Sequence, residues 1–349
     1  MTATRLAILG VTGSIGQQAL DVVTAHPDKL TVTRSGHRGD DLVALATADD
    51  VDLVLVATPG IAGLDATVAA LEAGKDVALA NKEVLVVGGH LVRALAGGAG
   101  KRLRPVDSEH CALWQCLAGV RMQDVARVTL TASGGPFRET GLDELSGVTA
   151  ERALRHPTWS MGPKVTVDSA TLVNKGYEVI EAHWLYGIPY DRIDVVLHPE
   201  SVVHALVELV DGSVIAQLAE PDMRLPIQYA LLWEHERGPA RRLDLTRNRE
   251  LRFLGAPDAE RYPCLDVVLR AARSGDARAL IGLSAADEIA VERFLGGEMT
   301  FGEIASMLRR GVEMARGTAG QTVPDLAEIR VIDRAVRLAL SEAAAGVTA

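Results

Sequence analysis

Cysteine is scarce in this sequence, and the few cysteines are not spaced for a zinc site or a disulfide framework. The chain has three of them, Cys111, Cys116 and Cys264, and an odd number is typical of a reducing cytosol. The sequence also lacks an apolar run long enough to cross a bilayer, and a charged N-terminal segment followed by an apolar block. We therefore expect a cytoplasmic protein with no membrane partner.

Positive charge is also in short supply. The 349 residues include 36 Lys and Arg against 46 Asp and Glu, which gives a formal net charge of −10. This balance argues against nucleic acid or an anionic membrane as a partner. The length predicts two or three domains and a sizeable core.

The N-terminal segment has the layout of a dinucleotide-binding loop. A short apolar strand at Leu6–Leu9 is followed by Gly10-Val-Thr-Gly13-Ser-Ile-Gly16 and then by an amphipathic helix that Pro27 closes. The glycines let the backbone approach a pyrophosphate, and the helix N-terminus supplies N–H donors. Because the spacing is G-x-x-G-x-x-G and not G-x-G-x-x-G, a tight turn in another kind of α/β protein remains the alternative.

The second predicted strand, at residues 30–33, ends in basic residues. Arg34, His37 and Arg38 stand where an acidic residue would bind the ribose of NAD, so they favour the 2′-phosphate of NADPH. Two aspartates follow directly, at positions 40 and 41, and weaken this preference.

Further strands are predicted at residues 51–57 and 76–80, and the second of them ends in Asn81-Lys82-Glu83. Ligands of doubly wound sheets bind at the carboxyl ends of the strands. We therefore expect these three residues to face the nicotinamide or the substrate; a helix cap with surface charge is the alternative.

Two carboxylates follow the strand predicted at residues 103–106. Asp107 and Glu109 are two positions apart, so both can reach one hard divalent cation, and oxygen ligands suit Mg²⁺ or Mn²⁺. An acidic pair alone is more often a cap or a solvated loop. Glu178, in a later polar cluster, is the expected third carboxylate and favours the metal site.

That later cluster lies on a helix predicted from Ala170 to Leu185. Asn174, Glu178 and Glu181 are three or four residues apart and share one helix face, and Lys175 adjoins it. These side chains suit a phosphorylated polyol held beside a metal ion, whereas a solvated polar face is the alternative.

Two loops complete the predicted site. The strand at residues 128–132 opens into Ser133-Gly-Gly, whose backbone N–H groups could wrap an anion, although a simple turn would use the same residues. Residues 156–163, HPTWSMGP, have the composition of a loop that closes over a ligand. A rigid core loop is the alternative reading of that segment.

The remaining chain predicts strands at residues 193–197, 201–207 and 213–218, the last two joined by an Asp-Gly hairpin turn, and then mostly helices. We expect a mixed sheet whose exposed face could pair subunits. The predicted fold is α/β, with an N-terminal Rossmann-like NADPH domain, a central α/β catalytic domain with a mixed sheet, and a C-terminal helical bundle. The expected boundaries are 1–106, 107–238, a linker at 239–264, and 265–349.

The motifs, taken in order over nearly the whole chain, resemble those of the 1-deoxy-D-xylulose 5-phosphate reductoisomerase family. They are GVTGSIG, ANKE, PVDSEH, SGGPFRET, HPTWSMG, VDSATLVNKGYEVIEA, HPESVVH, DGSVIAQLAEPDM and RYPCL. The resemblance implies a homodimeric oxidoreductase of isoprenoid precursor synthesis. It would use NADPH and Mg²⁺ or Mn²⁺ to rearrange and reduce 1-deoxy-D-xylulose 5-phosphate to 2-C-methyl-D-erythritol 4-phosphate. A paralogue acting on a related ketose phosphate, or a non-catalytic sugar-phosphate-binding homologue, is the alternative.

The resemblance also implies roles for individual residues. The cofactor would contact Thr12, Gly13, Ser14, Ile15, Gly36, His37, Arg38, Asn81, Glu83 and Gly162. The metal would be held by Asp107, Glu109 and Glu178. The substrate would contact Ser108, Ser133, His156, Trp159, Met161, Gly162, Ser169, Asn174, Lys175 and Glu178, and His156, Trp159, Met161 and Gly162 would form a lid. Lys82, Glu109 and His156 would be catalytic.

The chain departs from the family pattern mainly in its cofactor domain. Between Arg38 and Val51 it is far shorter than the segment the family usually has, which supplies an additional strand and helix. Single departures are Val84 for Ser, Cys111 for Asn, Ser284-Ala-Ala-Asp-Glu288 for Asn-Ala-Ala-Asn-Glu, and His37 for a commonly expected Lys. None falls on the three carboxylates or the expected phosphate contacts, so we expect the chemistry to be retained.

Overall fold

The computed structural model describes residues 3–37, 39–97, 102–155, 161–247, 250–318 and 323–345. Two expected lid residues, His156 and Trp159, lie outside these ranges. So does Arg38 at the expected adenosine end.

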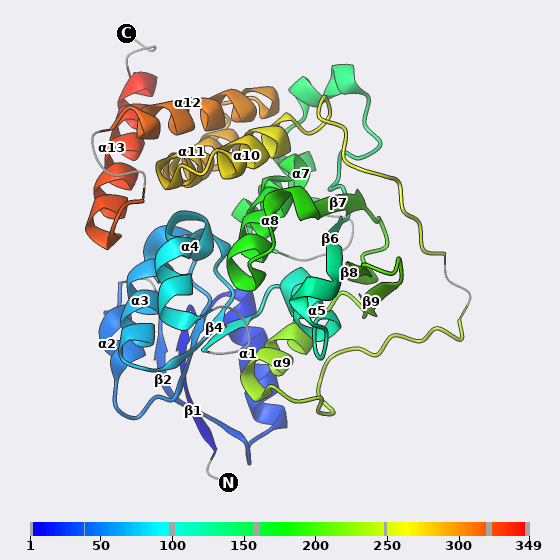
Figure 1. Cartoon of the computed structure of the whole chain (residues 1–349). Helices are drawn as coiled ribbons and strands as arrows, with labels where there is room; N and C mark the ends of the chain where they lie inside the picture. Colours follow the sequence, from blue (N-terminus) through cyan, green and yellow to red (C-terminus); the bar gives the residue numbers. More distant parts are fainter. Residues whose placement is uncertain are drawn as a thin grey trace.

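A five-stranded parallel sheet forms the N-terminal part, as the apolar runs predict (Figure 1). Its order is β2-β1-β3-β4-β5. Both faces are covered, which explains why its strands are apolar with little alternation. The strands are β1 (Thr4–Leu9), β2 (Leu30–Gly36), β3 (Leu53–Val56), β4 (Asp76–Leu79) and β5 (Leu103–Pro105).

Alternate residues of β1 enter two different cores. Ala7 and Leu9 pack in the core beneath α2 (Leu42–Thr47), α3 (Leu64–Glu72) and α4 (Lys82–Ala96). Leu6 and Ile8 pack with α1 (Ser14–Ala25) on the opposite face. This is the two-residue period of a strand covered on both sides.

The second covering helix of that opposite face comes from much later in the chain. Helix α9 (Arg224–Leu232) packs beside α1, and its Ile227 and Leu231 share a core with Leu6 and Ile8. Helix α9 ends at Leu232, because the next residue, Trp233, takes a left-handed conformation with φ 56°. The expected catalytic segment therefore contributes a helix to the first sheet.

A four-stranded mixed sheet of order β7-β6-β8-β9 forms the central part, as predicted. β6 pairs parallel with β7 and antiparallel with β8, and β8 pairs antiparallel with β9. Helices α5 (Ser108–Cys116) and α8 (Val173–Tyr186) pack on it. The strands are β6 (Val125–Ala132), β7 (Ile193–Leu197), β8 (Val203–Leu209) and β9 (Val214–Leu218).

The helix predicted from Ala170 to Leu185 is two helices, so this prediction was wrong in its start and its continuity. Helix α7 begins at Pro163, a residue that suits a first helical position, and ends at Thr171. Leu172 then takes a left-handed conformation with φ 58°, and α8 begins at Val173. The break turns the chain, so that α7 and α8 present different faces to the same cavity.

Four helices form the C-terminal part, as predicted, and α11 packs on α4 while α10 packs on α8. One apolar core runs from a face of the first sheet through α4 and α8 into these helices. They are α10 (Pro263–Arg273), α11 (Ala277–Leu295), α12 (Ile304–Arg316) and α13 (Leu326–Ala345). The short α6 (Ala150–Ala153) precedes α7.

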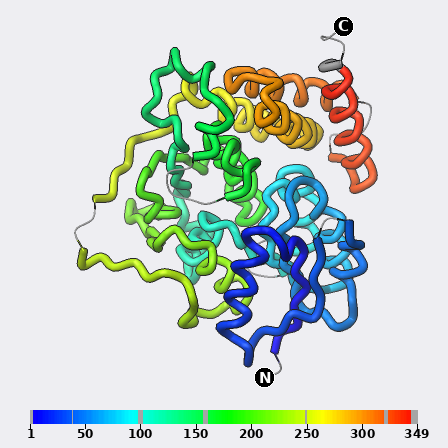
Figure 2. The backbone as a smooth tube through the Cα atoms, turned by 180° about the vertical axis from the view of Figure 1, so that it is seen from behind, coloured from blue at the N-terminus to red at the C-terminus, as the bar shows by residue number. Residues whose placement is uncertain are grey.

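Between α9 and α10, residues 233–247 and 250–262 contain no helix or strand, and this segment runs along the outside of the second sheet (Figure 2). No helix in the described ranges has the length and apolar character needed to cross a membrane.

Candidate active site

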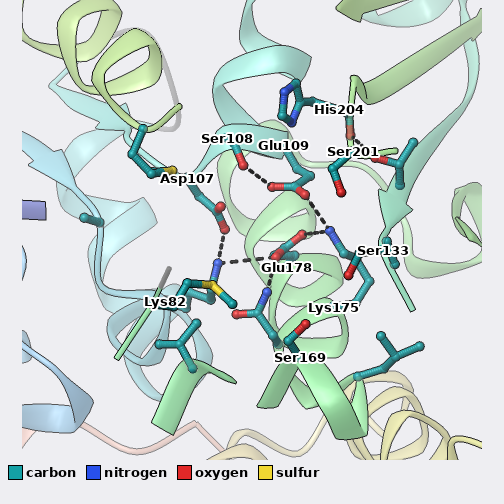
Figure 3. Close-up of a pocket in the computed structure, with 18 of the residues that line it drawn as sticks. Lys82, Asp107, Ser108, Glu109, Ser133, Ser169, Lys175, Glu178, Ser201 and His204 are labelled. Atoms are coloured by element: carbon teal, nitrogen blue, oxygen red, sulfur yellow. Dashed lines mark hydrogen bonds and ion pairs between the residues drawn. The ribbon is translucent and has the colours of Figure 1, made fainter. Parts of the chain in front are cut away.

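A cavity of about 210 Å³ lies where the two sheets meet the break between α7 and α8 (Figure 3). It brings together many residues that the sequence analysis singled out. These are Ser14, Ile15, Lys82, Asp107, Ser108, Glu109, Ser133, Met161, Gly162, Ser169, Asn174, Lys175 and Glu178. They come from segments that are far apart in the chain, so a single cavity is not a consequence of sequence proximity.

Three carboxylates converge on one side of this cavity. Asp107 directly precedes α5 and Glu109 lies in the first turn of that helix, while Glu178 reaches in from α8. One oxygen of each lies within 4.8 Å of the others. A hard divalent cation could therefore bind all three at once.

Two buried lysines accompany the carboxylates (Figure 3). Lys82 Nζ contacts Asp107 and lies 3.4 Å from Glu178 Oε1. Lys175 Nζ lies 2.9 Å from Glu109 Oε1 and also contacts Glu178. Burial lowers the pKa of Lys82, but the surrounding carboxylates outweigh it and hold that pKa well above its ordinary value.

The carboxylates that could bind the cation carry more negative charge than the two lysines balance. Burial, and then the neighbouring Glu109, raise the pKa of Glu178 to about 7. A fourth carboxylate, Glu181, is also buried here, and its Oε2 has no hydrogen-bond partner in the described part of the chain, although His110 Nε2 lies 3.3 Å away. Crowded, desolvated oxygen ligands of this kind fit Mg²⁺ or Mn²⁺.

The glycine loop reaches the cavity through Ser14 and Ile15, at the N-terminus of α1. Gly10 has φ 95°, which favours glycine. A Cβ at Gly16 would meet the carbonyl of Gly10 and lie 2.6 Å from Val11 Cα, so the third glycine is required for the helix to pack this closely. The loop fits a dinucleotide because the first turn of a helix leaves backbone N–H donors without partners inside the helix.

Replacing Gly16 by alanine should therefore disturb the loop and the fold together. We expect a loss of about 1–3 kcal/mol of stability from overpacking and a higher KM for NADPH. Thermal melting and steady-state kinetics measure the two effects. Gly147→Ala is the control, since a Cβ there has no atom within 4 Å; an unchanged KM for NADPH in Gly16→Ala would contradict the expectation.

Several expected cofactor residues lie outside the cavity lining. Gly36 accepts hydrogen bonds from the backbone N–H groups of Gly10 and Val11, and His37 pairs with Asp40 at 3.0 Å. Asn81 caps α4 by accepting from Val84 N at 3.0 Å. The expected cofactor residues outside the lining are Thr12, Gly13, Gly36, His37, Asn81 and Glu83.

The opposite side of the cavity suits an anion. Gly134 and Gly135 both have positive φ, 82° and 65°, and Gly135 N donates to Ser133 Oγ at 3.2 Å. Tyr262 fixes this turn by donating to Gly134 O at 2.9 Å. Ser133 and Ser169 both line this side.

Ser201 and His204 are among the polar residues of the lining to which sequence reasoning assigned no role. Ser201 precedes β8 and has φ 50°, and His204 is buried in the strand. Burial lowers the pKa of His204, so its neutral form is favoured beside the carboxylates. The motif HPESVVH contains both Ser201 and His204, and it could have identified them as site residues from the sequence.

Family models match most of the chain. A 1-deoxy-D-xylulose 5-phosphate reductoisomerase model matches residues 6–39 and 34–89 as two segments. Its C-terminal domain matches residues 103–186, and a DXP reductoisomerase C-terminal domain matches 218–339. The first two segments overlap at residues 34–39, at the end of β2.

Curated relatives agree with the models. A Thermomicrobium roseum protein named 1-deoxy-D-xylulose 5-phosphate reductoisomerase is 46% identical over 87% of this chain and 89% of its own length. A relative of the same name from Exiguobacterium sp. is 43% identical over 98% of this chain and 99% of its own length. That alignment spans 391 positions, more than the 349 residues present here, so the relative contains residues that this chain lacks.

Solved structures give the same result. A crystal structure of DOX-P reductoisomerase in complex with NADPH, fosmidomycin and magnesium has a TM-score of 0.90 at 34% identity over 99% of both chains. The Zymomonas mobilis reductoisomerase in complex with NADPH has a TM-score of 0.87 at 36% identity over 98% of this chain and 99% of that one. On these matches the chain belongs to the 1-deoxy-D-xylulose 5-phosphate reductoisomerase family.

Proposed function

We propose that this protein converts 1-deoxy-D-xylulose 5-phosphate to 2-C-methyl-D-erythritol 4-phosphate, with NADPH and Mg²⁺ or Mn²⁺. The observation that carries the proposal is the convergence of Asp107, Glu109 and Glu178 in a cavity that the glycine loop also enters. A metal site, an anion-binding turn and a dinucleotide loop in one cavity are what a metal-assisted rearrangement followed by reduction requires.

The residues of the cavity have separate roles in binding the cation, the cofactor and the substrate. Asp107, Glu109 and Glu178 hold the cation, and Ser14 and Ile15 hold the cofactor phosphates. The substrate phosphate and hydroxyls are bound by Ser133, Ser169, Asn174 and Lys175, while Ser108 contacts the substrate backbone. Thr12, Gly13, Gly36, His37, Arg38, Asn81 and Glu83 complete the cofactor site, and His156 and Trp159 complete the lid and substrate contacts.

The reaction breaks and re-forms a carbon–carbon bond and then reduces the branched aldehyde that results. A bound divalent cation polarises the ketone and the adjacent hydroxyl, and NADPH supplies the hydride. Lys82 lies beside Asp107 and Glu178, so its ammonium offsets negative charge that develops on the substrate oxygens. Met161 and Gly162 line the cavity and, as part of the lid, exclude water, which keeps the two fragments paired.

We further propose a cytoplasmic homodimer that pairs through the second sheet. β9 is an edge strand of that sheet, and Val214 is 54% exposed on it. An exposed edge of this kind invites pairing with a second chain.

NADPH consumption by the purified protein tests the proposed activity. Absorbance at the nicotinamide band should fall only when 1-deoxy-D-xylulose 5-phosphate and Mg²⁺ or Mn²⁺ are both present, and the product should be the branched tetritol phosphate. Binding without turnover would indicate a non-catalytic homologue. Turnover of a different ketose phosphate alone would indicate a paralogue.

A further inference from the structure

A buried ionic cluster lies directly behind the cavity, and none of its charged groups lines it. Lys164 Nζ lies 2.9 Å from Glu83 Oε1, 2.7 Å from Asp168 Oδ2 and 2.8 Å from Asp287 Oδ2. Tyr177 OH donates to the same oxygen of Asp287 at 3.2 Å. The Lys164 ammonium thus joins three helices. α4 covers the first sheet, α7 lines the cavity, and α11 belongs to the C-terminal helices.

The cluster holds α7 on the helix face next to the one that lines the cavity. Lys164 and Asp168 are four residues apart and share the helix face that meets α4 and α11. Val165 and Ser169, each one position further along, share the neighbouring face, and both line the cavity. Successive helical residues are rotated by about 100° around the helix axis. A rotation of α7 about its axis would therefore carry Ser169 away from the cavity.

The two aspartates of the cluster are almost fully withdrawn from solvent, whereas the Lys164 side chain is 23% exposed. Asp168 is 2% exposed and Asp287 is 1% exposed. Burial, reinforced by Asp287, raises the pKa of Asp168 well above its ordinary value. Removing Lys164 would leave three carboxylates with no cation between them, and the ionic link that ties α7 to α4 and α11 would be lost.

Gly162 caps the start of α7 two residues before Lys164, and Met161 precedes it. Both line the cavity. The position of Lys164 therefore also bears on where Met161 and Gly162 meet the cavity.

We propose that Lys164 is a positioning residue for the substrate: by tying α7 to α4 and α11, it holds Ser169 and Gly162 where the phosphorylated substrate binds. This role rests on the proposed function. Lys164 does not line the cavity, so it acts through α7 and not by direct contact.

The test compares Lys164→Met with Lys164→Arg and with Arg337→Met. Arg337 forms a comparable cluster with Glu288 and Asp333 between α11 and α13, away from α7. It is therefore a control for the loss of a partly buried basic residue that joins helices of the same layer. Adding Asp287→Asn to Lys164→Met removes one carboxylate from the cluster. This double variant is the second test if Lys164→Met alone does not fold.

We expect Lys164→Met to raise KM for 1-deoxy-D-xylulose 5-phosphate by about tenfold or more, with kcat changed by less than about threefold. Lys164→Arg should recover most of this loss. Arg337→Met should lower the melting temperature without moving KM. Asp287→Asn in the Lys164→Met background should restore thermal stability more than it restores KM.

A normal substrate KM in folded Lys164→Met, or in the double variant if the single variant does not fold, would overturn the inference. So would an equal rise of KM in Arg337→Met. Failure of the proposed function is seen separately, as wild-type protein that consumes no NADPH. In that case calorimetric titration of the same ketose phosphate into wild type and variants still decides whether Lys164 supports substrate binding.

Discussion

Replacing Glu109 by glutamine should abolish turnover and leave NADPH binding nearly intact. Glu109 is one of three converging carboxylates and also contacts Lys175, whereas the glycine loop lies on another element. Loss of a metal ligand removes several kcal/mol of transition-state stabilisation, or about a thousandfold in rate. Steady-state kinetics with Mg²⁺ and a fluorescence titration of NADPH measure the two quantities separately.

Glu151→Gln is the matched control for this substitution. Glu151 is exposed on α6, where it pairs with Arg155, so the same chemical change there should leave both quantities unaltered. Equal loss of turnover and NADPH affinity in Glu109→Gln would count against the role proposed for Glu109.

Gly135→Ala should impair both folding and substrate binding. Its φ of 65° is left-handed, and a Cβ there would lie 2.8 Å from Ser169 O and 2.9 Å from Ala170 Cα. We expect a loss of about 2–5 kcal/mol, of which about 1–2 come from the backbone conformation and the rest from the clash. Because the clash falls on the backbone of α7, it should also displace Ser169 and raise KM for the ketose phosphate.

The neighbouring Gly134→Ala separates the two causes. Gly134 also has positive φ, 82°, but a Cβ there would meet only the flexible side chain of Arg138, at 3.0 Å. It should lose about 1–2 kcal/mol from backbone strain alone. Chemical denaturation and substrate kinetics on both variants would contradict this account if the two behaved alike.

Local sequence patterns were sufficient to predict much of the fold and many of the side chains that meet in the cavity. Both sheets form from the predicted strands, and β7 has the predicted ends. The spacing of Asp107 and Glu109 after a strand, and of Asn174 and Glu178 on a helix, placed these side chains correctly relative to one another. Such patterns depend only on residues close in sequence.

Features that depend on distant packing could not be predicted in this way. Leucine has no preference for the left-handed conformation, yet Leu172 adopts it because its side chain is buried with Ala132, Leu197 and Tyr262. Nothing in the sequence of α9 indicates that it covers the first sheet. Glu83 likewise follows a predicted strand end, but its carboxylate is held by Lys164, which is 81 positions later.

The return of α9 to the first sheet has a consequence for how the protein is synthesised. A nascent chain that has emerged only as far as Val106 has all five parallel strands, but Leu6, Ile8, Leu53 and Leu55 still lack the cover of Ile227 and Leu231. The cofactor half therefore cannot complete its interior until more than a hundred further residues have left the ribosome. Chaperones that shield apolar surface would act in that interval, and a fragment ending at Val106 would be prone to aggregate.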